Sequence, residues 1–195
     1  MEVLKTRLDI LKHLEGYNAK KTIGFVPTMG GLHEGHLKLI EASKNECAVT
    51  LCSVFVNPMQ FNDDNDFKHY PRNLEEDLEK LRKAGCDIVY TPETSDLYLK
   101  NEKVKEFDFG TLTTNMEGKF RKGHFNGMAT VVEKFFKLIM PTKAFFGEKD
   151  LQQLQIVKLL VKQIDVPIKV VGIATVREKN GLAKSSRNKL LSESE

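Results

Sequence analysis

Two histidines three positions apart are the first residues of this sequence whose types and spacing could do chemistry. His33 and His36 belong to the stretch PTMGGLHEGH, residues 27–36, between a short apolar run and an amphipathic segment. On the first turn of a helix, side chains three positions apart can face the same bound group, and the free N–H groups of a helix start attract phosphate. The stretch therefore predicts a phosphate site, in which two imidazoles stabilise the charge that develops when phosphorus is attacked.

Glycines within the same stretch support this interpretation. Gly30 and Gly31 let the backbone approach a ligand closely, and Gly35 permits tight packing at the helix start. A metal-binding pair and a structural pair are the alternatives for the two histidines. Zinc helices more often carry HExxH, with four-residue spacing and a catalytic glutamate, so the pattern favours phosphate chemistry.

Cations follow two later apolar runs. Lys149, two residues after Gly147, could reach an anion as a flexible point charge. Asp150 could cap the next helix or contact a ribose, and a solvated helix turn is the alternative for both. Residues 184–187 place two hydroxyls between Lys184 and Arg187, an arrangement that suits a polyphosphate, although basic loops are common.

Uncharged amides near these clusters suit a small hydroxy acid. Gln60 and Gln153 can each donate to a carboxylate and accept from a hydroxyl, and Asn57 could help similarly. Gln152 and Gln153 would point about 100° apart on a helix, so at most one of them should face the site. Three further cations could face an acid or lie in a solvated loop: Lys119, Arg121 and Lys122.

The apolar residues alternate between strand-like runs and helical spacing along the chain. Strands are expected at 22–26 (ended by Pro27), 49–56, 87–90, 144–146 and 168–173, with a short edge strand at 106–109. Helices are expected at 5–14, 37–44, 74–81 (ending near Gly85), 128–139 and 151–164, with a surface loop at 62–66. This alternation predicts an α/β fold with a doubly wound parallel sheet. Its ligands would lie at the carboxyl ends of the strands, where the four polar clusters 27–36, 57–61, 147–153 and 184–188 fall.

Composition excludes several classes of protein. The formal net charge is +3 with both signs well mixed, which gives no basic field for nucleic acid. The sequence has no apolar run of about 18 residues, and residues 1–12 lack the apolar core of a signal peptide. Its three cysteines show neither CxxC spacing nor an even number, which favours reduced thiols. We therefore expect a cytoplasmic protein without nucleic-acid or membrane partners.

Six motifs in order and spacing resemble those of the pantothenate synthetase (pantoate–β-alanine ligase) family, from about residue 22 to 191. They are PTMGGLHEGH, FVNPMQF, YPRNLEEDL, KGHFNGMATVV, FFGEKDLQQL and GLAKSSRN. The resemblance implies a Rossmann-like sheet of the HxGH nucleotidyltransferase type. It also implies a ligation in two steps, with pantoate, ATP, Mg²⁺ and β-alanine as reactants and a pantoyl-adenylate as intermediate. A homodimer is implied as well.

The resemblance also implies roles for individual residues. His36 would be the catalytic proton donor, with His33 beside it at the phosphates. Pantoate would bind Gln60 and Gln153, with β-alanine near Gln60 and with help from Asn57, and no metal ligand is predicted. The implied ATP-binding residues are Met29, Gly30, Gly31, Leu32, His33, Glu34, Gly35, His36, Gly147, Glu148, Lys149, Asp150, Val176, Lys184, Ser185, Ser186 and Arg187.

The family pattern is not matched everywhere. Gly31 stands where alanine is commoner, and Lys184 stands where methionine is frequent. Residues 1–185 are expected to form the ATP- and pantoate-binding domain, and residues 186–195 the start of a linker to the family's smaller C-terminal domain, most of which the sequence lacks. Two other hypotheses stay open: a different HxGH nucleotidyltransferase, and a domain that binds both substrates but turns over poorly without its closing partner.

Overall fold

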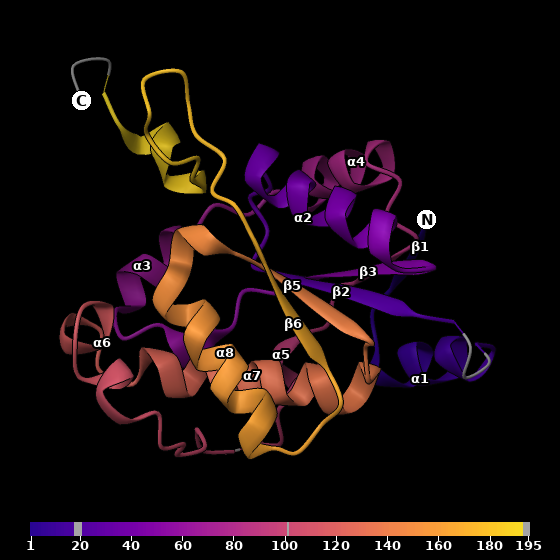
Figure 1. Cartoon of the computed structure of the whole chain (residues 1–195), viewed down its shortest axis with the longest axis horizontal. Coiled ribbons are helices and arrows are strands. Elements are labelled where there is room, and N and C mark those ends of the chain that lie inside the picture. Colours follow the sequence, from indigo (N-terminus) through magenta and orange to yellow (C-terminus); the bar gives the residue numbers. More distant parts are fainter. Residues whose placement is uncertain (18–20, 101, 193–195) are drawn as a thin grey trace.

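A parallel sheet forms the centre of the protein, and helices cover both of its faces (Figure 1). The computed structural model describes residues 1–17, 21–100 and 102–192. Within them the strand order is β1-β4-β3-β2-β5-β6, and every neighbouring pair is parallel. The strands are β1 (Glu2–Leu4), β2 (Ile23–Thr28), β3 (Val49–Val54), β4 (Ile88–Tyr90), β5 (Lys143–Gly147) and β6 (Lys169–Ile173).

Helices separate the strands in sequence. The α-helices are α1 (Arg7–Glu15), α2 (Glu34–Glu46), α3 (Asp64–His69), α4 (Leu74–Lys83), α5 (Thr94–Leu97), α6 (Glu117–Phe120), α7 (His124–Ile139) and α8 (Leu151–Gln163). The 3-10 turns are η1 (Pro58–Gln60), η2 (Gly110–Thr113), η3 (Glu148–Asp150) and η4 (Ser186–Leu190). The predicted α/β architecture is confirmed.

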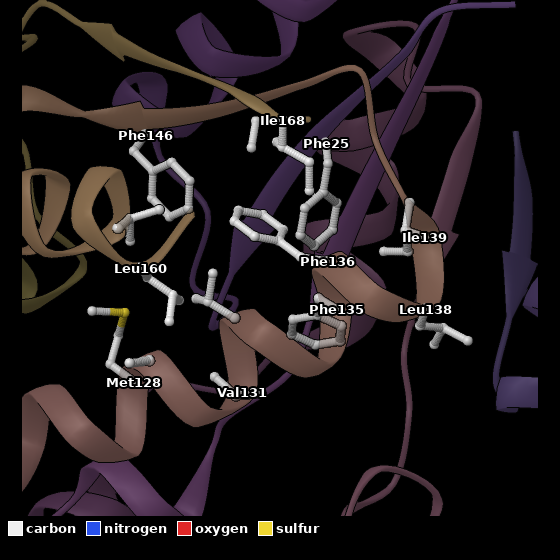
Figure 2. Packing of buried hydrophobic residues seen from close by; sticks show 14 of the residues in the cluster. Phe25, Met128, Val131, Phe135, Phe136, Leu138, Ile139, Phe146, Leu160 and Ile168 are labelled. Atoms are coloured by element: carbon white, nitrogen blue, oxygen red, sulfur yellow. The ribbon is translucent and has the colours of Figure 1, made fainter. Parts of the chain in front are cut away.

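Each face of the sheet has its own apolar core. Side chains alternate along β2, so Phe25 packs among α1, α7 and α8 while Val26 packs against α2 and α4. Figure 2 shows the larger core, where Phe25 meets Phe135 and Phe136 of α7. Burial on both faces explains why the strands of the sheet are apolar almost throughout.

The strand order reverses at β2, which is the switch point of the sheet. The chain leaves β2 toward β3 on one side, and β5 pairs with β2 on the other. The connections that leave the carboxyl ends of β2 and β5 diverge to opposite faces, and a crevice opens between them. The predicted polar clusters lie around this crevice.

Three local predictions were wrong. Pro27 does not end β2, because β2 pairs with β5 only as far as Phe25 and the missing N–H of proline therefore breaks no ladder bond on that side. The stretch 106–109 is not a strand, because the N–H groups of Lys105 and Phe107 donate to side chains of α7. The expected loop 62–66 is helical from Asp64 onward, since Asp63 caps α3 by accepting from the N–H of Asn65.

Candidate active site

A cleft of about 580 Å³ opens at the carboxyl ends of β2 and β5. Most of the residues predicted to bind ligands line it, although they come from distant parts of the chain. Those that do are Met29, His33, Gly35, His36, Asn57, Gln60, Gly147, Lys149, Asp150, Gln153, Val176, Lys184, Ser185, Ser186 and Arg187. The four predicted polar clusters therefore form one site.

One wall of the cleft consists of the turn after β2 and the start of α2, and we call it the histidine wall (Met29–His36). The N–H of Gly35 donates to Nδ1 of His33 over 3.1 Å, and the N–H of His33 donates to Nδ1 of His36 over 3.2 Å. Because a backbone N–H can only donate, each Nδ1 must carry a lone pair. In their neutral form both imidazoles therefore hold the proton on Nε2, which makes two N–H donors for the cleft.

Both histidines are neutral at physiological pH. Burial lowers the pKa of His36 to about 3, and the positive charge of Lys149 acts in the same direction. Burial also lowers the pKa of His33, with further contributions from Lys149 and Lys184. A phosphate bound at His33 and His36 would thus accept hydrogen bonds from neutral N–H groups. Its negative charge would have to be balanced by cations on another part of the cleft.

A carboxylate that sequence reasoning missed holds the glycine turn in place. Asp77 of α4 is 2% exposed and accepts from the N–H of Gly31 (2.9 Å) and from the N–H of Leu32 (2.7 Å). Gly30 has φ +81°, and a Cβ at this position would lie 2.9 Å from Oδ2 of Asp77. The aspartate of the YPRNLEEDL motif was the available signal, but sequence spacing does not reveal a contact across 46 positions.

Five predicted ATP-binding residues do not line the cleft: Gly30, Gly31, Leu32, Glu34 and Glu148. Asp77 takes the N–H groups of Gly31 and Leu32, and the N–H of Gly30 donates to the Thr28 hydroxyl. Side chains and the start of α2 therefore face the cleft, whereas the glycine N–H groups have internal partners.

The opposite wall carries cations, and we call it the cation wall (Lys149, Lys184 and Arg187). Each cation contacts at least one carboxylate: Lys149 contacts Asp150 at 2.9 Å, Arg187 contacts Asp66 at 2.8 Å, and Lys184 contacts both Glu34 at 2.8 Å and Glu178 at 3.0 Å. The carboxylates are between 40 and 67% exposed. Exposed ion pairs contribute little to stability, so a polyphosphate could exchange for these partners at low cost.

The histidine wall and the loop that carries Lys184 and Arg187 approach each other closely at Gly31 and Ser186. A Cβ on Gly31 would lie 3.2 Å from Cβ of Ser186. The side chain of Arg187 also stacks over the ring of Tyr70, 5.4 Å from its centroid. Tyr70 and Asp66 line the cleft and were not predicted as site residues.

The side-chain amides of Asn57 and Gln60 differ in whether they can still bind a ligand. Asn57 is buried, and its amide already bonds Gln60, Gly127, Met59 and Tyr98, so it positions its neighbours and offers no free group. Gln60 donates from Nε2 to the thioether of Met29 over 2.9 Å. Sulfur is a weak acceptor, and a ligand oxygen would therefore be a better partner for this N–H.

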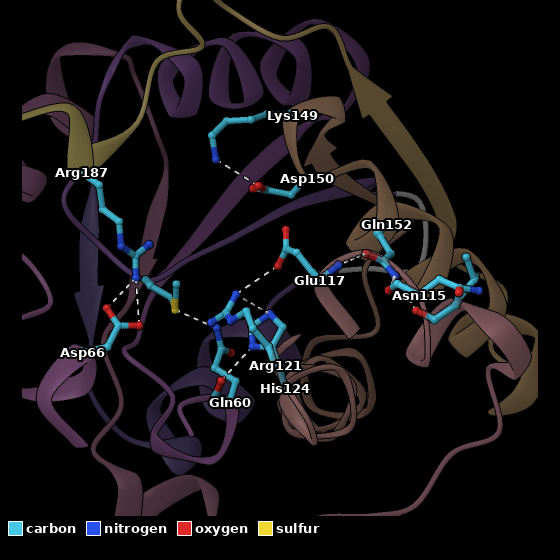
Figure 3. A network of polar contacts seen from close by, with 12 residues as sticks. Gln60, Asp66, Asn115, Glu117, Arg121, His124, Lys149, Asp150, Gln152 and Arg187 are labelled. Atoms are coloured by element: carbon cyan, nitrogen blue, oxygen red, sulfur yellow. Dashed lines mark hydrogen bonds and ion pairs between the residues drawn. The ribbon is translucent and has the colours of Figure 1, made fainter. Parts of the chain in front are cut away.

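Only one of the two adjacent glutamines of α8 faces the cleft, as the helical spacing predicted. Gln153 lines the cleft, whereas Gln152 is 7% exposed and turns away from it. Gln152 accepts from the N–H of Glu117 and donates to the carbonyls of Leu112 and Asn115. It therefore fixes the segment that carries Glu117 and Arg121 to the cleft (Figure 3).

An apolar surface from α7 completes the cleft, formed by Met128, Val131, Val132 and Phe135. Among the described residues, no group of three or more His, Cys, Asp or Glu side chains could hold a metal ion. No helix in the described ranges is long and apolar enough to cross a membrane.

The fold and the site define a doubly wound α/β protein of the HxGH type. The sequence profile described as pantoate–β-alanine ligase matches residues 2–195. The chain is 50% identical over 194 residues to the pantothenate synthetase of Christiangramia forsetii, covering 98% of this chain and 69% of that protein. It is 45% identical over 176 residues to the pantothenate synthetase of Acinetobacter baylyi, covering 90% and 63%. The chain belongs to the pantoate–β-alanine ligase family.

Solved structures agree with this assignment. The pantoate–β-alanine ligase of Francisella tularensis, complexed with β-γ ATP and β-alanine, matches with a TM-score of 0.96 and 37% identity, covering 99% of this chain and 74% of that one. The enzyme of Thermus thermophilus matches with a TM-score of 0.93 and 43% identity, covering 100% and 69%. The chain spans 59 to 70% of the length of the curated relatives that it matches.

Proposed function

We propose that this chain carries the site for an ATP-dependent ligation of pantoate to β-alanine, with a pantoyl-adenylate as intermediate. The observation that carries the proposal is the meeting of the two walls across one cleft. Neutral imidazole donors lie on one side, exchangeable cations on the other, and the amides of Gln60 and Gln153 beside an apolar surface. The F. tularensis relative, which was solved in complex with β-γ ATP and β-alanine, supports the same assignment.

In the first step, a carboxylate oxygen of pantoate would attack the α-phosphorus of ATP, and the bond to the bridging oxygen would break to release pyrophosphate. Lys149, Lys184 and Arg187 would bind the polyphosphate once it replaces their carboxylate partners. The Nε2–H groups of His33 and His36 would stabilise the negative charge that grows on the phosphate oxygens. The side chains of the site act by positioning and charge stabilisation, which is how phosphoryl and adenylyl transfer is usually catalysed.

Pantoate combines a carboxylate, two hydroxyls and a dimethyl-substituted carbon. Gln60 and Gln153 can serve the polar groups, since each amide both donates and accepts. The α7 surface, with Val131 and Val132, offers contacts for the methyl groups. In the second step, the amine nitrogen of β-alanine would attack the acyl carbon, lose a proton and release AMP.

Mg²⁺ would enter with its nucleotide. The described residues supply no metal-binding cluster, and Mg²⁺ in nucleotide sites is held largely by phosphate oxygens and water. The nucleotide substrate would therefore be Mg²⁺-ATP, with no residue of the described chain needed as a ligand of the metal.

Exchange of labelled pyrophosphate into ATP tests the first step. We expect exchange that depends on pantoate and does not require β-alanine. Its absence at saturating pantoate and ATP, in a protein that binds both by calorimetry, would leave a binding domain without adenylation activity. Absence of both exchange and binding would contradict the proposal.

Three further expectations follow from the sequence and the family resemblance. These are a homodimer, which light scattering after gel filtration would detect, a location in the cytoplasm, and a boundary near residue 185 between the substrate-binding domain and a linker.

A further inference from the structure

Arg121, a cation outside the cation wall, also lines the cleft. It lies beside Gln60 and His124, apart from Lys149 and Arg187 of the cation wall (Figure 3). Lys149 and Lys184 act on the pKa of His33, while the charge of Arg121 acts on the pKa of His124. Arg121 therefore belongs to a different part of the cleft, near the amide of Gln60.

The side chain of Arg121 is held from one edge only. Its Nη1 donates to Oε2 of Glu117 and to Nε2 of His124, each over 3.1 Å. His124 must accept with Nε2, because its Nδ1 donates to the carbonyl of Gln60 over 2.7 Å. Burial lowers the pKa of His124, which agrees with this neutral form.

The other edge of the guanidinium has no partner in the described part of the chain. Nη2 and Nε form the fork with which arginine binds a carboxylate through two parallel hydrogen bonds. The side chain is 33% exposed, so a small anion can reach it. Gln152 helps to hold Arg121 in position, because its hydrogen bonds fix the backbone of residues 112–117 and thereby the start of α6.

The surrounding charges fit a zwitterion better than a plain anion. Glu117, which contacts Arg121, and Asp150, which contacts Lys149, both line the cleft, and both act on the pKa of His124. One free arginine fork with two carboxylates nearby complements a small molecule that carries a carboxylate at one end and an amino group at the other.

We propose that Arg121, oriented by Glu117 and His124, binds the carboxylate of the amine substrate and selects amino acids over simple amines. The inference rests on the proposed function and adds to it the residue that determines amine specificity. The amino end of the substrate is then directed away from Arg121, toward the acyl group held near Gln60.

Paired ligands that differ only in the carboxylate test this inference. Calorimetry compares pantothenate with pantothenol, in which a CH₂OH group replaces the carboxylate, on the wild-type protein and on Arg121→Met. We expect the wild type to bind pantothenate roughly 10- to 100-fold more tightly, as is typical for hydrogen bonds between charged groups. Arg121→Met should lose this preference while its affinity for pantothenol stays within about 2-fold. Arg121→Lys should keep part of the preference, because it keeps the charge but not the fork.

A neighbouring cation supplies the matched control. Lys119 also belongs to α6, but it lies over the ring of Phe120 and does not line the cleft, so Lys119→Met should keep the full preference. A preference that survives in Arg121→Met, or an equal loss of both ligands with an unchanged melting temperature, would overturn the inference. Binding of neither ligand to the wild type would instead contradict the proposed function, and this inference with it.

Discussion

The two walls of the cleft are built in opposite ways. Most of the backbone N–H groups from Gly30 to Gly35 donate to side chains of the protein, and one of the acceptors, Asp77, is itself buried. On the cation wall, Lys149, Lys184 and Arg187 contact exposed carboxylates. The histidine wall is therefore fixed before a ligand arrives, whereas the cation wall can exchange partners.

This difference suits the two tasks of an adenylation site. Donors that stabilise a transition state must already be in place, because reorganisation during the reaction costs rate. Cations that admit a substrate and release pyrophosphate must bind reversibly. Substitutions on the histidine wall should accordingly change the rate or the stability, and substitutions on the cation wall should change mainly the nucleotide affinity.

The largest effect is expected for His36→Asn. Asparagine keeps an acceptor near the position of Nδ1 for the N–H of His33 but removes the Nε2–H donor, so the rate of pantoate-dependent pyrophosphate exchange should fall about 10²- to 10³-fold. His13→Asn is the matched control, because His13 contacts Glu2 and Tyr17 and does not line the cleft. Equal rates for the two variants would show that the Nε2–H of His36 takes no part.

Asp77→Asn should give the next largest effect. One of the two backbone N–H groups would then face an amide NH₂, and an unsatisfied buried donor costs about 1–3 kcal/mol. Urea unfolding measures this loss, and weaker ATP binding should accompany it because the turn is displaced. Asp87→Asn is the control: this exposed carboxylate accepts from the N–H of Thr50, and its loss should cost less than about 1 kcal/mol. Equal losses would mean that Asp77 gives the turn no special support.

Lowering the pH should gradually reduce the stability of the folded protein through His36. His36 has a folded-state pKa of about 3, below its ordinary value of 6.5, so below about pH 6.5 the unfolded chain binds a proton that the folded protein does not. The stabilisation from neutral His36 is present above pH 6.5 and is lost as the pH falls toward 3. Urea midpoints at about pH 7, 5 and 4 should fall less steeply in His36→Asn than in the wild type, and parallel curves would contradict the burial of a neutral imidazole.

The smallest effects should come from the pair formed by Arg187 and Asp66. Arg187→Met removes a cation from the polyphosphate and should weaken ATP binding roughly 10-fold, by the usual strength of a charged hydrogen bond. Asp66→Asn breaks the same ion pair but leaves the cation free, so ATP affinity should stay equal or rise a few-fold. Both variants should unfold within about 1 kcal/mol of the wild type. Similar losses of affinity in both would show that Asp66 orients Arg187 for the nucleotide.

The alternation of apolar runs was sufficient to predict the doubly wound sheet, because burial on both faces leaves a clear signal at β2, β3 and β5. Strand β1 was not predicted, since Glu2–Leu4 is short and lies at the exposed edge of the sheet. The false strand at 106–109 had suitable residues, but side chains of α7 bind its backbone N–H groups. Local sequence does not show which partner a backbone group will find.

The site was predictable where chemistry and spacing coincide, as in His33 and His36, and where a helix separates neighbours, as in Gln152 and Gln153. The residues that hold these side chains and the turn in position were not predictable. Asp77 acts on Gly31 and His124 acts on Gln60 only after the fold brings them together. Sequence also does not show that the N–H of Gly31 donates to the buried carboxylate of Asp77 and that the N–H of Gly30 donates to the Thr28 hydroxyl.

Strand β1 is separated from its neighbour in the sheet by a long stretch of chain. It pairs with β4, yet β2, β3 and helices α1 to α4 come between them in sequence. Contacts between distant segments close large loops and form slowly. During translation, β1 is made well before β4 and has no edge to join until β4 has been added. At this edge, therefore, the order of synthesis is the reverse of the order of assembly.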